Sequence, residues 1–263
     1  MSFLTIYLWG LPIAIGMMSL LWVISIFKKN VSIVDIFWGA GFVLLTAYYF
    51  LVTRGFVLRK LIILVLVCTW GLRLTIYILW RNRGKGEDFR YREFRRKYGK
   101  ERYWWVSFFQ TFLLQGVLMW LISAPLLGGQ YYSVHDTFGV GDGLGILVWI
   151  FGFVFEAGGD IQLARFKKDP GNRGKVLDTG FWRYTRHPNY FGDSCVWWGY
   201  GILSIAGGSI IPIYGSVVMT LLIIRVSGVM LLEKSLKQNK PGYREYAERT
   251  GAFLPWFPKK KSY

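Results

Sequence analysis

Residues that form disulfides and metal sites are scarce in this sequence. Its 263 residues include two cysteines, Cys68 and Cys195, and two histidines, His135 and His187. Two cysteines in apolar surroundings do not make a disulfide framework, and neither a C-x-x-C nor an H-x-x-x-H pair occurs. The pattern predicts packing roles for the cysteines and no metal site. Any chemistry would then depend on an organic cofactor or on carboxylates and tyrosines.

Acidic residues are also few, because 15 aspartates and glutamates accompany 32 lysines and arginines, for a net charge of +17. Such a charge is common in nucleic-acid binders, but here the cations follow the ends of apolar segments. Ten lie within 81–102, seven within 165–186 and eight within 234–261, whereas 128–143 has none. Cytoplasmic loops of membrane proteins are enriched in Lys and Arg. We therefore expect these cations to set the orientation and to contact membrane lipids, and we expect no nucleic-acid partner.

Linkers and internal repeats are absent as well, and 53% of the residues are hydrophobic. The sequence predicts an all-α, polytopic membrane bundle of about seven transmembrane helices, each near the ~20 residues that cross a bilayer. The loop charges place the N-terminus outside and the C-terminus in the cytoplasm. The first span has no basic segment before it and no cleavage site, so we expect a retained helix. The expected spans are 3–27, 32–53, 57–80, 105–127, 144–165, 191–206 and 209–232.

The two halves of the chain differ in where their polar residues lie. The expected spans within 1–127 carry few charges, whereas short helices alternate with polar, glycine-rich connections from Glu156 onward. We predict one membrane domain over 1–263, in which 1–127 forms the substrate cavity and 144–263 binds a cofactor. The loop 81–104 interleaves aromatic residues with cations, which predicts a segment at the membrane interface.

Charged side chains inside a span are costly and mark candidate functional sites. Glu156 and Asp160 are four residues apart, so both project from one face of a helix. One interpretation is an ion pair with Arg165, Arg73 or Arg225. The other is that the two carboxylates bind the hydroxyls or the amide of a cofactor.

Three polar residues of the first half are candidates for catalysis. Asp35 lies at the expected start of the second span, where it either caps the helix, in competition with Ser32, or faces the substrate as an acid. Arg73 and Tyr77 share one face of the third span. We expect Arg73 to pair with a carboxylate or a ligand, and Tyr77 to be a proton donor or a structural tyrosine.

The segment 180–193, GFWRYTRHPNYFGD, is the densest polar cluster of the chain. Pro188 is suited to the first turn of a helix, with Asn189 as a possible cap. Arg186 and His187 are not explained in this way. The preceding loop, 169–175, adds glycines that permit close backbone approach, together with Asn172 and Arg173. Because no G-x-G-x-x-G fingerprint occurs, this candidate diphosphate site would not belong to a Rossmann fold.

The order of these motifs resembles the C-terminal half of the steroid 5-alpha-reductase and sterol-reductase superfamily, and the whole chain is similar to its bacterial branch. In the first half, Asp35-x-x-Trp38 and Arg73-x-x-x-Tyr77 match that branch. In the second half, the resemblance is carried by Glu156-x-x-x-Asp160-x-Gln162, by NRGK at 172–175, by 180–193, and by the tail from Leu232-Glu233-Lys234 through Tyr243-x-x-Tyr246 to Pro255.

The resemblance implies a seven-helix reductase of the bacterial inner membrane. Such an enzyme takes hydride from NADPH, bound on the cytoplasmic side, and adds it to a carbon–carbon double bond conjugated to a carbonyl in a steroid-like or other lipid substrate. By position, Glu156, Asp160, Asn189 and Asp193 would bind polar groups of NADPH, Arg173 and Arg186 its phosphates, and Tyr243 and Tyr246 would close the cytoplasmic side. The other implied cofactor contacts are Gln162, Arg165, Asn172, Tyr184, His187, Tyr190 and Glu233.

The superfamily's catalytic residues do not all align with this chain. Its glutamate in the second span and tyrosine in the third span have no secure counterpart, so Asp35, Tyr77 and Arg73 are assigned to catalysis from their chemistry and location. In the expected mechanism, a protonated or hydrogen-bonding pair of side chains draws electron density onto the carbonyl oxygen of the substrate. This role requires a group that donates a proton near neutral pH.

An alternative is a membrane S-adenosylmethionine-dependent methyltransferase of the isoprenylcysteine or phospholipid type, in which a related Arg-His-Pro-x-Tyr element occurs. Those enzymes usually show paired glutamates after the last span, whereas Glu233 is followed by Lys234. The loop at 172–174 also suits a cofactor that carries phosphate. A lipid-binding or transport protein is a third reading, and the sequence selects neither a particular substrate nor an oligomeric state.

Overall fold

Regular structure in the computed structural model is helical. The described residues are 1–133, 136–227, 229, 233, 236, 238 and 240–259, excepting the side chains of 226 and 227, and no strand occurs among them. The predicted all-α class is therefore confirmed. His135, Leu232 and Lys234 lie outside the described residues, as does part of the span expected at 209–232.

Within the described parts of the chain, four helical segments are long and apolar enough to cross a membrane. They are α1 (Phe3–Lys28), α4 (Val57–Asn82), the continuous run Lys100–Tyr131, and α9 (Val140–Lys168). The shorter apolar helices are Trp38–Val52 and Ile211–Arg225. The protein thus has the character of a membrane protein that contacts lipid, while the expected number of seven spans stays a prediction.

Two of the expected spans have interruptions. The span expected at 32–53 is divided into α2 (Ile33–Ile36) and α3 (Trp38–Val52), with Phe37 between them at φ −91° and ψ 4°. The run Lys100–Tyr131 consists of α6 (Lys100–Ser107), the π-helical η1 (Phe108–Leu113), α7 (Leu114–Ile122) and α8 (Ala124–Tyr131). Hydropathy measures the length of an apolar segment but not such local changes in helical geometry.

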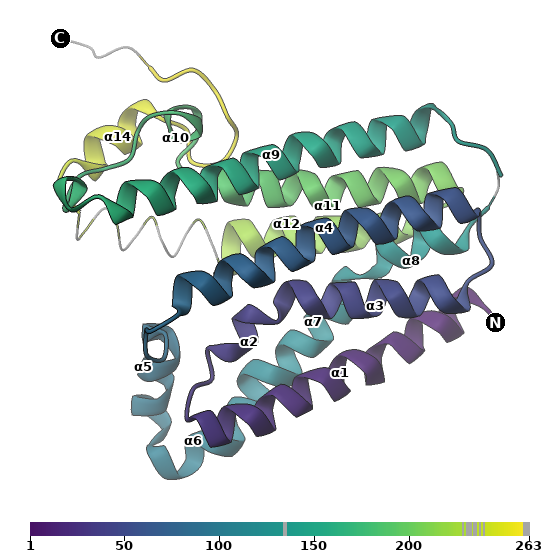
Figure 1. Ribbon diagram of the computed structural model, residues 1–263, viewed down its shortest axis with the longest axis horizontal. Helices are drawn as coiled ribbons and strands as arrows, with labels where there is room; N and C mark the ends of the chain where they lie inside the picture. The colour runs from purple at the N-terminus through teal and green to yellow at the C-terminus, as the bar shows by residue number, and fades with distance from the viewer. Residues whose placement is uncertain are drawn as a thin grey trace. The chain divides into compact units, whose positions relative to one another are not determined.

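The chain forms two compact units. Unit 1 contains residues 1–138 and 204–212, and unit 2 contains 139–203 and 213–263. In unit 1, α1, α3, α4 and α7 are neighbouring helices, and the short α5 (Phe89–Tyr98) packs against α6 (Figure 1). Reciprocal hydrogen bonds join Tyr7 and Trp120, whose side chains each donate to the other residue's carbonyl.

The closest helix packing in unit 1 joins α3 to α4. A Cβ atom at Gly39 would overlap the backbone of Gly71, and one at Gly71 would meet the Gly39 carbonyl oxygen at 2.7 Å. Small residues at such a crossing let two apolar helices approach closely, which is how helices associate in lipid. This crossing fixes the part of α4 that carries Arg73.

Two cations of unit 1 are buried at the end of α4 that precedes its apolar stretch. Arg59 lies over the Phe56 ring, and Lys60 donates to the Thr53 carbonyl while its ammonium lies over Phe50. The expected topology places the connection between the spans 32–53 and 57–80 outside, and of the three cations near it, Arg54, Arg59 and Lys60, only Arg54 is exposed.

Unit 2 is built on α9 and α11 (Pro188–Gly207), of which residues 188–203 belong to this unit. Close approach is again made through glycine, because a Cβ at Gly192 would meet the Gly152 carbonyl oxygen at 2.5 Å. The other elements of unit 2 among the described residues are η2 (Pro170–Asn172), α10 (Phe181–Tyr184), α12 (Tyr214–Leu221), η4 (Leu222–Ser227) and α14 (Tyr243–Arg249). The 3-10 helix η3 (Ile211–Ile213) includes the last two residues of unit 1 and the first residue of the following segment of unit 2.

Candidate functional site

The segment 180–193 turns from a short helix into a long one. Gly180, at φ +59°, begins α10, which ends at Thr185 in extended conformation. The next helix, α11, begins at Pro188, as the sequence predicts, because proline has no N–H to lose in the first turn. Arg186 and His187 are therefore held between two helices, and both side chains are buried.

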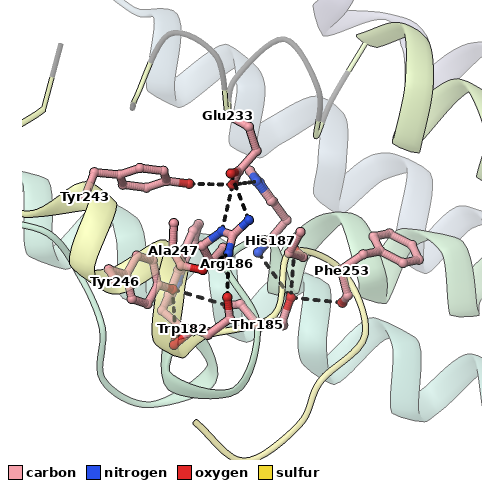
Figure 2. A network of polar contacts seen from close by, with 11 residues as sticks. Trp182, Thr185, Arg186, His187, Glu233, Tyr243, Tyr246, Ala247 and Phe253 are labelled. Carbon is pink, nitrogen blue, oxygen red and sulfur yellow. Dashed lines mark hydrogen bonds and ion pairs between the residues drawn. The ribbon is translucent and has the colours of Figure 1, made fainter. Parts of the chain in front are cut away.

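A bidentate ion pair forms the centre of this segment. Arg186 donates from Nε and Nη2 to the two carboxylate oxygens of Glu233, each at 2.8 Å (Figure 2). The side chains are only 8% and 11% exposed. Nη1 of Arg186 donates to the carbonyls of Ala247 and Thr250 at the end of α14. One guanidinium thus joins residues 186–190, which we call the RHPNY segment, to two later parts of the chain.

Two further side chains donate to Glu233. Nε2 of His187 lies 3.0 Å and the Tyr243 hydroxyl 2.7 Å from Glu233 Oε1 (Figure 2). The His187 ring also stacks on Tyr190, with 5.6 Å between centroids. We call Arg186, His187, Glu233 and Tyr243 the Glu233 cluster.

The electrostatics of the Glu233 cluster follow from these contacts. Burial alone would raise the pKa of Glu233, but the hydrogen bonds from His187, Arg186 and Tyr243 outweigh it and lower that pKa well below the ordinary 4.5. Burial and the bond to this carboxylate raise the pKa of Tyr243. Glu233 is thus ionised and Tyr243 neutral across the physiological range.

The tail after α14 is bound to the same segment by backbone groups. The Thr185 hydroxyl lies 2.9 Å from the Phe253 carbonyl (Figure 2). The Arg186 amide donates to the Gly251 carbonyl at 3.0 Å. The Tyr246 hydroxyl donates to the Trp182 carbonyl. Tyr243 and Tyr246, expected to close the cytoplasmic side, thus both contact the motif-bearing part of unit 2.

The expected polar pair on α9 is buried against the start of α11. Glu156 and Asp160 are 3% and 6% exposed, and the amide of Asn189 donates to Asp160 at 3.2 Å. Oδ1 of Asn189 is buried, and no donor within the described parts of the chain reaches it. Asp193 follows one turn later on α11. These four residues thus lie on two packed helices, and their binding of a cofactor stays a prediction.

Other expected cofactor residues have structural contacts. Gln162 accepts a hydrogen bond from the Phe181 amide at 3.0 Å, and the Tyr184 ring packs edge-on against Phe257. The Asn172 amide donates to Asp169 and to the Phe166 carbonyl, which closes the loop after α9. Arg165 and Arg173 are exposed to solvent.

The three catalytic candidates all lie in unit 1. Asp35 does not cap α2, because its carboxylate accepts from Arg90 Nη2 and from the Tyr91 hydroxyl, both at 2.8 Å. Arg73 and Tyr77 are half-buried on α4, and the Arg81 guanidinium lies over the Tyr77 ring. We call Asp35, Arg90 and Tyr91 the Asp35 cluster.

Burial has the larger effect on the Asp35 cluster. It raises the pKa of Asp35 above the ordinary 3.8, although Arg90 and Tyr91 act against it. The pKa of Tyr91 is also raised, by burial and then by the charge of Asp35. Asp35 therefore accepts a proton more readily than an ordinary aspartate.

The chain matches the family model described as "Protein of unknown function (DUF1295)" over residues 21–250. The protein belongs to the DUF1295 family. It is also 26% identical, over 272 residues, to "Uncharacterized protein C594.04c" of the fission yeast Schizosaccharomyces pombe, covering 94% of this chain and 78% of the yeast protein. No solved structure matches the chain. The region matched by the DUF1295 model includes both the Asp35 cluster and the Glu233 cluster.

Sequence reasoning placed Arg90 and Tyr91 only in an interfacial loop and missed their contacts with Asp35. A signal was present, because Asp35 is the only acidic residue before Glu87 in a half rich in arginine. An isolated carboxylate near a membrane needs a cationic or hydroxyl partner. The sequence does not say which of the many cations supplies it.

Proposed function

We propose that this DUF1295 protein is a membrane-embedded, NADPH-dependent reductase. It would add hydride to a carbon–carbon double bond conjugated to a carbonyl in a steroid-like or other lipid substrate. The observation that carries the proposal is the contact of Asp160 with Asn189, beside Glu156, which is partly buried between α9 and α11. These residues belong to the motifs that resemble the steroid 5-alpha-reductase superfamily.

The residues present fit the polar groups of NADPH. Carboxylates accept hydrogen bonds from ribose hydroxyls and from a carboxamide, and Oδ1 of Asn189 is a buried acceptor that lacks a donor within the described residues. A ligand N–H or O–H would remove the free-energy cost of leaving that atom unsatisfied. The proposal assigns hydroxyl and amide recognition to Glu156, Asp160, Asn189 and Asp193.

The sequence-based expectation gave the phosphate contacts to both Arg173 and Arg186, and the proposal assigns them differently. Arg186 directs its Nε, Nη1 and Nη2 groups to Glu233 and to two carbonyls, so in this arrangement it supports the site. Arg173 is exposed on the loop after α9 and has no such commitment in the described structure. The proposal therefore gives the main phosphate contact to Arg173.

Proton donation is assigned to the Asp35 cluster. NADPH, when bound, supplies the hydride. The Tyr91 hydroxyl donates to Asp35, and its raised pKa keeps it protonated at neutral pH. Protonated Asp35 would donate a hydrogen bond to the developing negative charge on the substrate oxygen, and Tyr91 would hold the carboxyl in position. Tyr77 and Arg73 remain candidate partners in this role.

The proposed topology has seven spans, an outer N-terminus and a cytoplasmic C-terminus in a bacterial inner membrane. Burial of Arg59 and Lys60 supports it, because these two cations contact a ring and a carbonyl inside the protein rather than being exposed in an outer loop. Cysteine-accessibility labelling of Arg54→Cys and Lys175→Cys in intact cells tests the orientation. Reaction of the position-175 cysteine with an impermeant reagent would overturn it.

Ligand-induced stabilisation of the purified full-length protein tests the cofactor. We expect NADPH to raise the melting temperature and S-adenosylmethionine to leave it unchanged, because only a bound ligand stabilises the folded state. The reverse result would replace the reductase proposal with the methyltransferase. NADPH oxidation against a panel of lipid enones would then identify the substrate class.

Arg173→Ala tests the phosphate contact, with Lys175→Ala as a matched control for loss of a cation from the same loop. We expect Arg173→Ala to weaken NADPH binding roughly tenfold, since it removes a charge-assisted hydrogen bond. The control should change affinity much less. Equal affinities in both variants would remove Arg173 from the site.

A further inference from the structure

A pocket of unit 2 lined mainly by polar and charged residues lies beside α14 and uses none of Glu156, Asp160 or Asn189. Its volume is about 290 Å³. Three of its lining residues are cations from three separate segments, and one is acidic. The lining residues are Asp178, Thr179, Arg183, Tyr246, Arg249, Thr250, Pro258 and Lys259.

The positive charges of this pocket are only partly neutralised. Arg249 Nη2 lies 3.6 Å from Asp178, longer than a charge-assisted hydrogen bond of about 2.7–2.9 Å. The Nε atom of Arg249 is buried and reaches no acceptor among the described residues. With Arg183 and Lys259 added, the lining carries an excess of two positive charges. Such an arrangement attracts an anion with several acceptor oxygens.

Hydrogen bonds to the backbone connect the segments that carry the three cations. The Lys259 amide donates to the Arg249 carbonyl at 2.9 Å, and the Arg183 amide donates to Gly180 at 3.2 Å. The Thr250 hydroxyl lies 3.4 Å from the Arg183 carbonyl, which connects the two arginine-bearing segments. Orientation in a membrane requires cations on a loop, but it does not require their convergence on one pocket. The fold thus brings three cation-bearing segments to one pocket.

We propose that this pocket binds a phosphoryl group, as a phosphate monoester, a phosphodiester or a diphosphate. Arg249 supplies Nε and its fork of donors, Arg183 and Lys259 supply charge, and the ligand displaces Asp178 from Arg249. The phosphoryl group belongs to an anionic lipid headgroup or to a soluble phosphate compound. The inference does not depend on reductase activity, because it rests on the lining of this pocket alone.

Isothermal titration calorimetry of the purified full-length protein with inorganic pyrophosphate tests the site. We expect wild type to bind, and Arg249→Gln and Arg183→Gln each to weaken binding roughly tenfold or more, since each removes a charge-assisted contact. Arg244→Gln is the matched control, because this exposed arginine is on α14 but does not line the pocket. Circular dichroism checks that each variant is folded.

Asp178→Asn gives the sharper test, because it changes affinity in the opposite direction. The substitution removes the negative charge that competes for Arg249, so pyrophosphate should bind more tightly than to wild type. A merely structural role for the Asp178–Arg249 pair would give no such gain. Absence of pyrophosphate binding, or equal affinity in wild type, Arg249→Gln and Arg183→Gln, would overturn the proposal.

Competition distinguishes the two sources of the phosphoryl group. Wild type in nanodiscs of phosphatidylglycerol is compared with wild type in nanodiscs of phosphatidylcholine. Loss of pyrophosphate binding only in the anionic lipid supports a headgroup ligand, and equal binding in both supports a soluble phosphate compound. Either result is separate from the NADPH test, because Arg249→Gln leaves the α9–α11 residues in place.

Discussion

The Asp35 cluster of unit 1 and the Glu233 cluster of unit 2 combine the same side chains, a carboxylate with an arginine and a tyrosine. Glu233 accepts two hydrogen bonds from Arg186, one from His187 and one from Tyr243. Asp35 accepts one from Arg90 and one from Tyr91. Arg186 is 8% exposed, whereas Arg90 is 45% exposed and also bonds Asp88.

This difference in hydrogen bonds gives the two carboxylates opposite properties. Four donors lower the pKa of Glu233 against the effect of burial, whereas two donors leave burial dominant and the pKa of Asp35 raised. A carboxylate that stays charged is suited to hold a structure together. One that accepts a proton readily is suited to acid chemistry. The pairing of residue types alone does not decide between these roles.

The largest expected effect is on the stability of the Glu233 cluster. Glu233→Gln leaves the buried Arg186 without its counter-charge, so we expect the free energy of unfolding to fall by about 3–5 kcal/mol. Denaturant-induced unfolding of the purified protein measures it. Glu245→Gln, on the exposed side of α14, is the control and should have little effect. A fall in the free energy of unfolding of less than about 1 kcal/mol would show that the Glu233 cluster contributes little to stability.

A similar substitution at Asp35 should affect activity rather than stability. Asp35→Asn removes the proposed proton donor, so we expect turnover to fall roughly a hundredfold or more. The affinity for NADPH should be unchanged, and stability should change by less than about 1 kcal/mol, because burial disfavours the ionised aspartate that is removed. Normal turnover would end the catalytic assignment. A large loss of stability would show that Asp35, like Glu233, has a mainly structural role.

A smaller effect is expected from Tyr91→Phe. The lost hydroxyl stabilised the ionised form of Asp35, so the pKa of Asp35 should rise further. If Asp35 is the acid, the corresponding limb of the pH–rate profile moves to higher pH. Tyr98→Phe, on the same helix, serves as the control. An unshifted pH–rate profile would show that the Tyr91 hydroxyl does not affect the pKa of the catalytic acid.

The smallest expected effect is a change of stability with pH. The folded-state pKa of Glu233 lies below its ordinary value of 4.5, so its contribution is fully present above that pH and declines as the pH falls further. The difference in melting temperature between wild type and Glu233→Gln should be constant above about pH 5 and should narrow below about pH 4.5. A difference in melting temperature that widens below about pH 4.5 would show that folding raises the pKa of Glu233 instead of lowering it.

Several parts of the fold and of the candidate site could be predicted from sequence. Hydropathy identified the long apolar helices, and Pro188 correctly marked the start of α11. The i, i+4 spacing of Glu156 and Asp160 predicted one polar face, and both side chains are buried. Helical periodicity and proline geometry are local properties of the chain, so neighbouring residues are sufficient to read them.

The contacts of Arg186 and Asp35 were not accessible in the same way. Arg186 was expected to contact phosphate, but it pairs with Glu233, 47 residues later. Asp35 was expected to cap a helix or face a substrate, and it pairs with Arg90, 55 residues later. Many cations could satisfy each carboxylate, and only the packing of the chain selects among them. The phosphate role of Arg186 and the catalytic role of Asp35 stay predictions.

The sequence by itself determined that this chain is helical and apolar enough for a membrane, because helix formation and transfer into lipid depend on short stretches of residues. It also determined which residues are able to do chemistry. The tertiary structure decided which carboxylate is saturated with donors and which is not, and it brought Arg183, Arg249 and Lys259 to one pocket. The physical reason is that the charge of a buried group depends on how many donors reach it, and those donors come from distant parts of the chain.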